Sequence, residues 1–198
     1  MSEELIPSTQ NLDILAPWLI EQSLPTEIDR LIKRSLCDVG ILENPPSSNR
    51  GKRIDYYNTL CRVPLGSSYC AAALTGWTDY AGAWHPSTLA SWWTSKGLAV
   101  GNPASVSDWI RAAKDEGRWT STPALGRAVV YGNKLDQGTH IGLLIRSPDL
   151  EQLLYRSFEA NTSTNPGYSR EGGGFEMKWQ TEDQRKRVTG YIILSKNI

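Results

Sequence analysis

The stretch GSSYCAAAL, residues 66–74, places a cysteine between a small, flexible turn and an alanine-rich run that can begin a helix. A free cysteine titrates near pH ~8.5, and its thiolate is the reactive form. The first turn of a helix presents unpaired N–H groups and the positive end of the peptide dipoles, and both stabilise a thiolate. Cys70 is therefore a candidate nucleophile. The alternative is a small buried thiol that packs as a hydrophobe, which is the commoner role of cysteine.

Helical patterns surround this stretch and strands follow it. Helices are expected at residues 26–40, 54–60, 70–80, 86–93 and 107–116, and residues 43–53 (ENPPSSNRGKR) form a loop. Strands are expected at residues 128–131, 140–145, 153–158, 174–179 and 188–194. Helices first and strands afterwards predict an α+β fold, with N-terminal helices packed on a C-terminal antiparallel sheet of about five strands.

The length of 198 residues suits one domain with a short extension. Residues 1–25 contain three prolines and an apolar patch around Trp18, so we interpret them as an N-terminal extension that packs on the body. A partner-docking or export element is the alternative. Residues 26–198 form the domain.

The composition excludes several classes of function. Lysine plus arginine (21) equals aspartate plus glutamate (21), so no global field favours nucleic acid or an anionic membrane. No stretch approaches the ~20 apolar residues of a membrane span. Three cysteines and two histidines at scattered positions fit neither a disulfide framework nor a metal site, so we expect no metal and no cofactor.

A cysteine nucleophile needs a base, usually histidine, and a third group that orients the imidazole. His140 opens a predicted strand after a glycine-containing turn, whereas His85 precedes Pro86 in a loop or helix entry, which favours His140. Glu159 and Asn161 follow the third strand, and period-two alternation would place both on one side, within reach of His140. A carboxylate would favour the protonated imidazole and an amide would only orient it. Spacing does not choose between them.

Five segments together resemble the CHAP family of cysteine- and histidine-dependent amidohydrolases and peptidases, which is related to NlpC/P60 and papain-like enzymes. The matching segments, in the family's order, are CDVGILENPPSSNRG (37–51), SYCAA (68–72), HIGLL (140–144), EANT (159–162) and REGGG (170–174). The sequence departs from the family pattern at Tyr69, where tryptophan is usual, at Ala160, where glycine is usual, and at Gly126-Arg127, where Gly-Asp is common.

The resemblance implies a papain-like fold and a peptidoglycan hydrolase that cuts an amide bond, either as an N-acetylmuramoyl-L-alanine amidase or as a peptide endopeptidase. It implies Cys70 as nucleophile, His140 as base and Glu159 as the group that orients His140. Asn161 would assist the same ring or polarise the substrate carbonyl. Tyr69 and the Cys70 N–H would lie at the oxyanion and substrate cleft. A catalytically silent wall-binding or interaction module is the alternative from another class, and a thiol hydrolase of a non-wall amide is a third.

The start of the chain, Met1-Ser2-Glu3-Glu4, lacks the basic region of a signal peptide. We therefore expect synthesis in the cytoplasm and action at the periplasm or cell wall, reached through a holin, as a phage lysin, or through a secretion machine, as an antibacterial effector. The expected partner is peptidoglycan, with an immunity or secretion partner compatible with the second route, and a monomer is favoured.

Overall fold

The computed structural model describes residues 24–134, 137–146, 155–162, 173–179 and 182–196. The extension predicted for residues 1–25 lies outside the described residues, apart from Leu24 and Pro25. The helices are α2 (Thr26–Leu36), α3 (Lys52–Leu60), α4 (Cys70–Ala81), α5 (Ala90–Ser95), α6 (Val106–Asp115) and α7 (Glu182–Lys186). The strands are β1 (Trp119–Thr120), β2 (Ala128–Lys134), β3 (Gln137–Arg146), β4 (Tyr155–Thr162), β5 (Gly174–Trp179) and β6 (Val188–Ile192).

The strands form one open antiparallel sheet in the order β1-β6-β2-β3-β4-β5. The predicted α+β fold, with helices preceding and packing on an antiparallel sheet, is confirmed. The sheet has one strand more than the sequence indicates, because the two-residue β1 pairs with β6 at the edge. Such a short strand has no hydrophobic alternation to reveal it.

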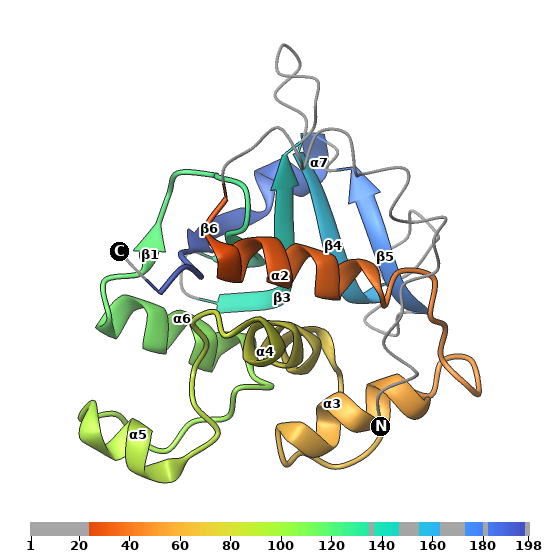
Figure 1. Cartoon of the computed structure of the whole chain (residues 1–198), viewed down its shortest axis with the longest axis horizontal. Coiled ribbons are helices and arrows are strands. Elements are labelled where there is room, and N and C mark those ends of the chain that lie inside the picture. The colour runs from red at the N-terminus through yellow and green to blue at the C-terminus, as the bar shows by residue number, and fades with distance from the viewer. Residues whose placement is uncertain (1–23, 135–136, 147–154, 163–172, 180–181, 197–198) are drawn as a thin grey trace.

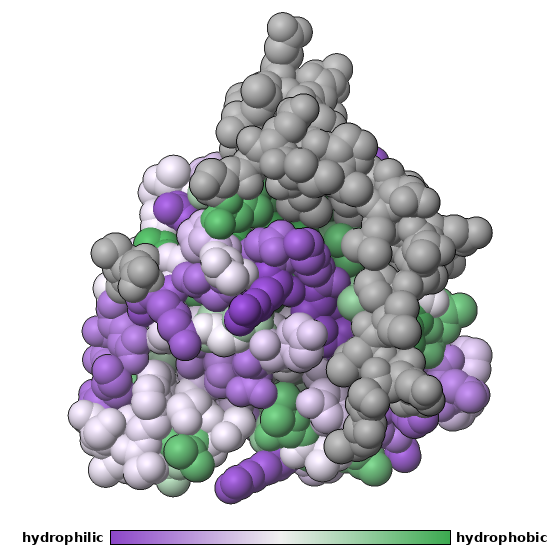
Figure 2. All heavy atoms as spheres, viewed as in Figure 1, coloured by the Kyte–Doolittle hydropathy of each residue, from purple (hydrophilic) through white to green (hydrophobic). Residues whose placement is uncertain are grey.

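The main core lies between the helices and one face of the sheet. Figure 1 shows α2 lying across the strands with α4 next to it. The buried side of α2, which includes Leu31 and Ile32, joins the cluster that contains Phe158 and Phe175 from the sheet. The outward side of α2 carries charged residues and appears as a hydrophilic band in Figure 2. No helix among the described residues is long and apolar enough to cross a membrane.

The opposite face of the sheet has a second, smaller cluster. Val129, Tyr131, Leu144 and Tyr191 are buried there, and they alternate along their strands with residues of the main core. Because neighbouring residues of a strand point to opposite faces, the side chains of His140 and Glu159 lie on the Tyr131 side of the sheet. The catalytic candidates of the sheet are therefore on the face away from the main core.

A buried carboxylate connects the first three described helices. Asp38, just after α2, is fully buried and accepts hydrogen bonds from Arg34 (3.0 Å), Arg53 (2.8 Å), Trp77 Nε1 (2.8 Å) and the Tyr57 hydroxyl. Arg34 also donates to the Tyr57 hydroxyl at 2.6 Å. These partners come from α2, α3 and α4, so one charge holds together the helices that precede the sheet.

The prediction that the fourth helix begins near Pro86 is wrong, because α5 begins only at Ala90. The side chain of Ser87 accepts a hydrogen bond from the Leu89 N–H at 3.0 Å, which stabilises a turn in place of a helical start. Leu89 itself is extended. The fourth helix therefore starts about one turn later than its sequence indicates.

Candidate active site

Cys70 is the first residue of α4, as the sequence predicts. Alanines follow it because this turn of the helix is packed completely against its surroundings, with Ala71, Ala72 and Ala73 fully buried. The backbone N–H groups of Ala71 and Ile141 both hydrogen-bond to the sulfur. Cys70 as a whole residue is only 7% exposed and belongs to the buried core.

The imidazole of His140 lies between Cys70 and Glu159. His140 hydrogen-bonds to the Cys70 sulfur, and its Nε2 lies 3.3 Å from Glu159 Oε2. The second contact is an ion pair that lacks the angle of a well-formed hydrogen bond. With Nε2 facing the carboxylate, Nδ1 is left for the sulfur. The His140 side chain is 23% exposed, while that of Glu159 is 4% exposed.

The N-terminus of α4 meets the sheet at the point where the pairing of β3 with β4 ends. Antiparallel pairing between β3 and β4 runs from Arg146↔Tyr155 to Gly142↔Glu159 and stops there, although β4 continues to pair with β5. The Ile141 N–H lies just beyond the last pair and is directed at the Cys70 sulfur. The N-terminus of α4 thus lies where β3 and β4 would otherwise continue to pair. From there Cys70 contacts His140.

These contacts favour a thiolate–imidazolium pair. Burial opposes charge on both groups, but the hydrogen bond and positive charge of His140, with the two N–H donors, bring the pKa of Cys70 below its ordinary value. Burial also opposes the charged imidazole, yet Cys70 and Glu159 raise the pKa of His140 to about 10. Against its own burial, Glu159 has its pKa lowered to about 2, chiefly by His140. Glu159 and His140 are therefore charged at neutral pH, and the Cys70 thiol loses its proton more readily than a free cysteine does.

Residues that the sequence analysis missed hold Glu159 in place. Its Oε1 accepts hydrogen bonds from the Tyr131 hydroxyl (2.9 Å) and from Ser157 (2.7 Å). Tyr131 is also the cross-strand partner of His140, and their rings lie 5.8 Å apart. Alternation along the strand could have indicated Ser157, two residues before Glu159. Tyr131 could be found only once the register of the β2–β3 hairpin was known.

Gly142 makes room for the carboxylate. A Cβ at this position would lie 2.8 Å from the carbonyl oxygen of Phe158, which is closer than real Cβ atoms come, and in a tight contact of 3.0 Å with Glu159 Cγ. The glycine in the HIGLL segment therefore permits the close approach of β4 and of the Glu159 side chain to β3. This contact gives a physical reason for the His-Ile-Gly sequence.

The alternation expected from Glu159 to Asn161 is interrupted in the structure. A β-bulge between Ala160 and Thr162 makes Asn161 the extra residue, and its φ of +57° is left-handed. Alternation therefore continues from Glu159 to Thr162, whose Oγ1 lies 3.5 Å from Glu159 Oε2. Asn161 is buried, and its backbone N–H hydrogen-bonds to the Tyr69 hydroxyl. Glu159 is the group at His140, and a part for the Asn161 amide stays a prediction.

Tyr69 also differs from its expected place at a substrate cleft. Its side chain is fully buried, packs against Phe175 with ring centroids 5.4 Å apart, and donates a hydrogen bond to Glu43 at 3.2 Å. Glu43 in turn accepts from the Asn49 N–H at 3.0 Å. Tyr69 therefore ties the loop after α2 to the start of α4 and to the bulge in β4, and we assign it to positioning and not to substrate contact.

His85 lies apart from this group, as expected. It follows the C-terminus of α4, where its Nε2 is 3.6 Å from Asp79, while Cys70 starts the same helix. Within the described part of the chain, no group of three or more histidine, cysteine, aspartate or glutamate side chains could hold a metal ion.

Comparison of the chain with protein-family models, curated proteins and solved structures finds no match. The motif resemblance therefore stays an expectation.

Iodoacetamide is expected to label Cys70 at least about tenfold faster than Cys37 or Cys61 near neutral pH, because the thiolate is the reacting form. Burial raises the pKa of Cys37 and raises that of Cys61 to about 12, whereas the pKa of Cys70 is lowered. Mass spectrometry of proteolytic peptides after timed labelling measures the three rates, and the other two cysteines serve as internal controls. Equal rates at all three would argue against an activated thiolate.

Proposed function

We propose that the protein is a thiol hydrolase that cleaves an amide bond of bacterial peptidoglycan. The observation that carries the proposal is a thiol at a helix N-terminus, hydrogen-bonded to an imidazole that a buried carboxylate pairs on its other side. A nucleophile, a base and an orienting group in contact form the constellation of covalent acyl transfer.

The proposed reaction has two halves. The Cys70 thiolate attacks the amide carbonyl, and the imidazolium of His140 gives its proton to the leaving amine as the carbon–nitrogen bond breaks. A thioester remains. A water molecule then loses a proton to the neutral His140 and attacks the thioester. The carbon–sulfur bond breaks, the acid is released, and the Cys70 thiolate and the His140 imidazolium are restored. The Cys70 N–H in the first turn of α4 is the proposed oxyanion donor, and losing one such donor typically costs about 10²–10³ in rate.

The choice of peptidoglycan depends on the motif resemblance to CHAP enzymes. The geometry of the three residues supports amide hydrolysis in general. The net charge of the chain, which is zero, does not distinguish between peptidoglycan and a small amide as the substrate. Action in the periplasm or cell wall, after passage through a holin or a secretion machine, belongs to the same proposal.

A substrate screen tests this function. Purified sacculi and a panel of small amides are incubated with the wild-type protein, and soluble fragments and released amines are measured. Release from sacculi well above that from small amides supports the proposal. Turnover of small amides alone would assign a different thiol hydrolase, and sedimentation with sacculi without release would assign a wall-binding module.

The pH dependence of kcat/KM should report the charged His140. Because its pKa is raised to about 10, the imidazolium persists through neutral pH and activity falls only as pH rises through that value. Glu159→Gln removes the charge that favours the imidazolium, so the alkaline limb is expected to move down by about one unit or more. Glu176→Gln, the cross-strand neighbour of Glu159, is the matched control. An unmoved limb in Glu159→Gln would contradict the assigned role.

A further inference from the structure

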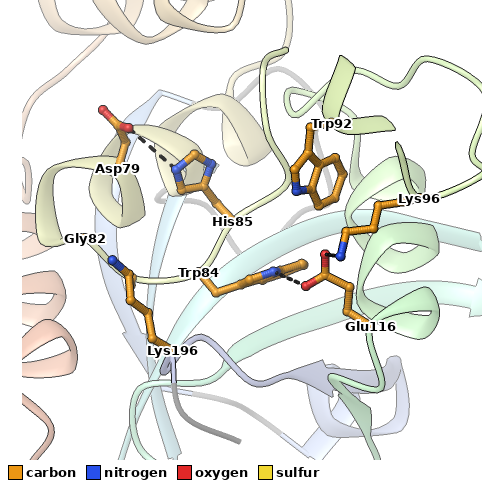
Figure 3. Close-up of a pocket in the computed structure, with 9 residues that line it drawn as sticks. Asp79, Gly82, Trp84, His85, Trp92, Lys96, Glu116 and Lys196 are labelled. Atoms are coloured by element: carbon orange, nitrogen blue, oxygen red, sulfur yellow. Dashed lines mark hydrogen bonds and ion pairs between the residues drawn. The ribbon is translucent and has the colours of Figure 1, made fainter. Parts of the chain in front are cut away.

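An open hollow of about 520 Å³ lies at the other end of α4 from Cys70. Figure 3 shows its lining, which comes from the end of α4, the segment after it, α5, the residue after α6 and the C-terminal segment. The volume is within the range of about 300–1,000 Å³ that small-molecule sites occupy. The 12 residues of α4, at about 1.5 Å each, put roughly 18 Å between the hollow and the nucleophile.

One wall of the hollow is an indole held in a single orientation. Trp84 donates its Nε1–H to Glu116 Oε2 at 2.7 Å, and the guanidinium of Arg118 lies 4.9 Å from the centre of its ring. The edge of Trp109 packs against it at 5.7 Å. Trp84 is nonetheless only half-buried and lines the hollow. Its ring therefore needs no ordering when a flat, weakly polar ligand packs against it.

Trp92 is a second indole on the lining, across the hollow in Figure 3. It lies edge-on against the buried Trp93 at 4.9 Å, and Trp93 is itself fixed by a hydrogen bond from its Nε1 to the Ser87 carbonyl. Two half-exposed tryptophans that are supported from behind are unusual on a surface, since buried packing is their ordinary role.

The polar groups on the rim balance in charge. Lys96 pairs with Glu116 at 3.1 Å, and Asp79 lies 3.6 Å from His85. Lys196 completes the set, so two lysines face two carboxylates beside a histidine. A rim without excess positive charge disfavours phosphates and polyanions, while carboxylates and ammonium groups side by side can accept from and donate to hydroxyl groups.

We propose that this hollow binds a neutral saccharide. The apolar C–H faces of a sugar ring fit the two indoles, and its hydroxyl groups fit the alternating acceptors and donors of the rim. On the proposed function, a glycan strand held here would keep its substrate amides near Cys70 through effective concentration. That advantage depends on the proposed function, whereas saccharide binding does not.

Titration with chitotetraose, a soluble neutral saccharide, tests the site in the full-length chain. The indole N–H signals of Trp84 and Trp92 in nuclear magnetic resonance spectra are expected to shift, with the other six tryptophans little changed. Trp92→Ala should weaken binding at least about tenfold, and Asp79→Asn should weaken it less. Tyr56→Ala, which removes an exposed ring outside the hollow, is the matched control and should bind normally.

The outcomes separate this site from the active site. Cys70→Ala is expected to lose hydrolysis and keep saccharide binding. If hydrolysis proves to be absent altogether, the indole shifts still decide the saccharide site. Unshifted Trp84 and Trp92 signals, or binding unaffected by Trp92→Ala, would overturn it, and so would shifts of the same signals with inorganic phosphate in place of the sugar.

Discussion

Cys70→Ala is expected to lower amide hydrolysis by about four orders of magnitude or more, because the variant retains no atom that can form the thioester. The remaining groups would still bind substrate, but His140 and Glu159 have no nucleophile to serve. The small side chain should fit the site, since the following helical positions are already alanine and fully buried. Its thermal unfolding is therefore expected to resemble that of the wild type.

Cys61→Ala is the matched control for this loss. Cys61 is also buried, but its sulfur lies 4.0 Å from the Ala72 carbonyl and takes no part in the His140 contacts. It should keep its activity. Undiminished hydrolysis by Cys70→Ala, with normal folding, would remove the nucleophile assignment.

Asp38→Ala is expected to lower the free energy of unfolding by about 3–5 kcal/mol, because it leaves a buried guanidinium without its counter-charge. Arg34 is 4% exposed, and although burial opposes its charge, Tyr57 and Asp38 keep its pKa above the ordinary value. Trp77 would lose the acceptor of its Nε1–H as well. Urea denaturation followed by tryptophan fluorescence measures the change.

Asp29→Ala provides the comparison on the same helix. Asp29 pairs with Lys33 at 2.8 Å on an exposed surface, where such pairs contribute about 0–1 kcal/mol. Similar unfolding midpoints for Asp38→Ala and Asp29→Ala would show that the buried network is not needed for stability.

The sequence predicts the elements of this fold well because their signals are local. The alanine run after Cys70 and the apolar runs of β2 and β3 each appear within ten residues of chain. The limits of α5 could not be predicted, since a turn stabilised by Ser87 competes with the helical start that Pro86 favours. The two-residue β1 is strand only through its pairing with β6.

The residues of the candidate site also differ in whether local sequence or strand pairing determines their place. Cys70, His140 and Glu159 were predicted from residue type and position, and the structure brings them together. The bulge at Asn161 was not predicted because alternation along a strand cannot foresee one. Tyr131 was missed because its bond to Glu159 depends on the register of three strands. The fully buried Tyr69 was read as a cleft residue because its neighbour is the nucleophile.

Mass spectrometry of digested peptidoglycan is the most direct measurement of the central claim. Sacculi incubated with the wild-type protein are predicted to yield fragments in which one amide is replaced by a free amine and a carboxylic acid, and the same digest with Cys70→Ala should lack them. The masses also identify the bond, either the muramyl–alanine amide or a peptide bond of the stem or bridge. Fragments from glycosidic cleavage alone, or the same amide products from Cys70→Ala, would contradict a thiol amidohydrolase.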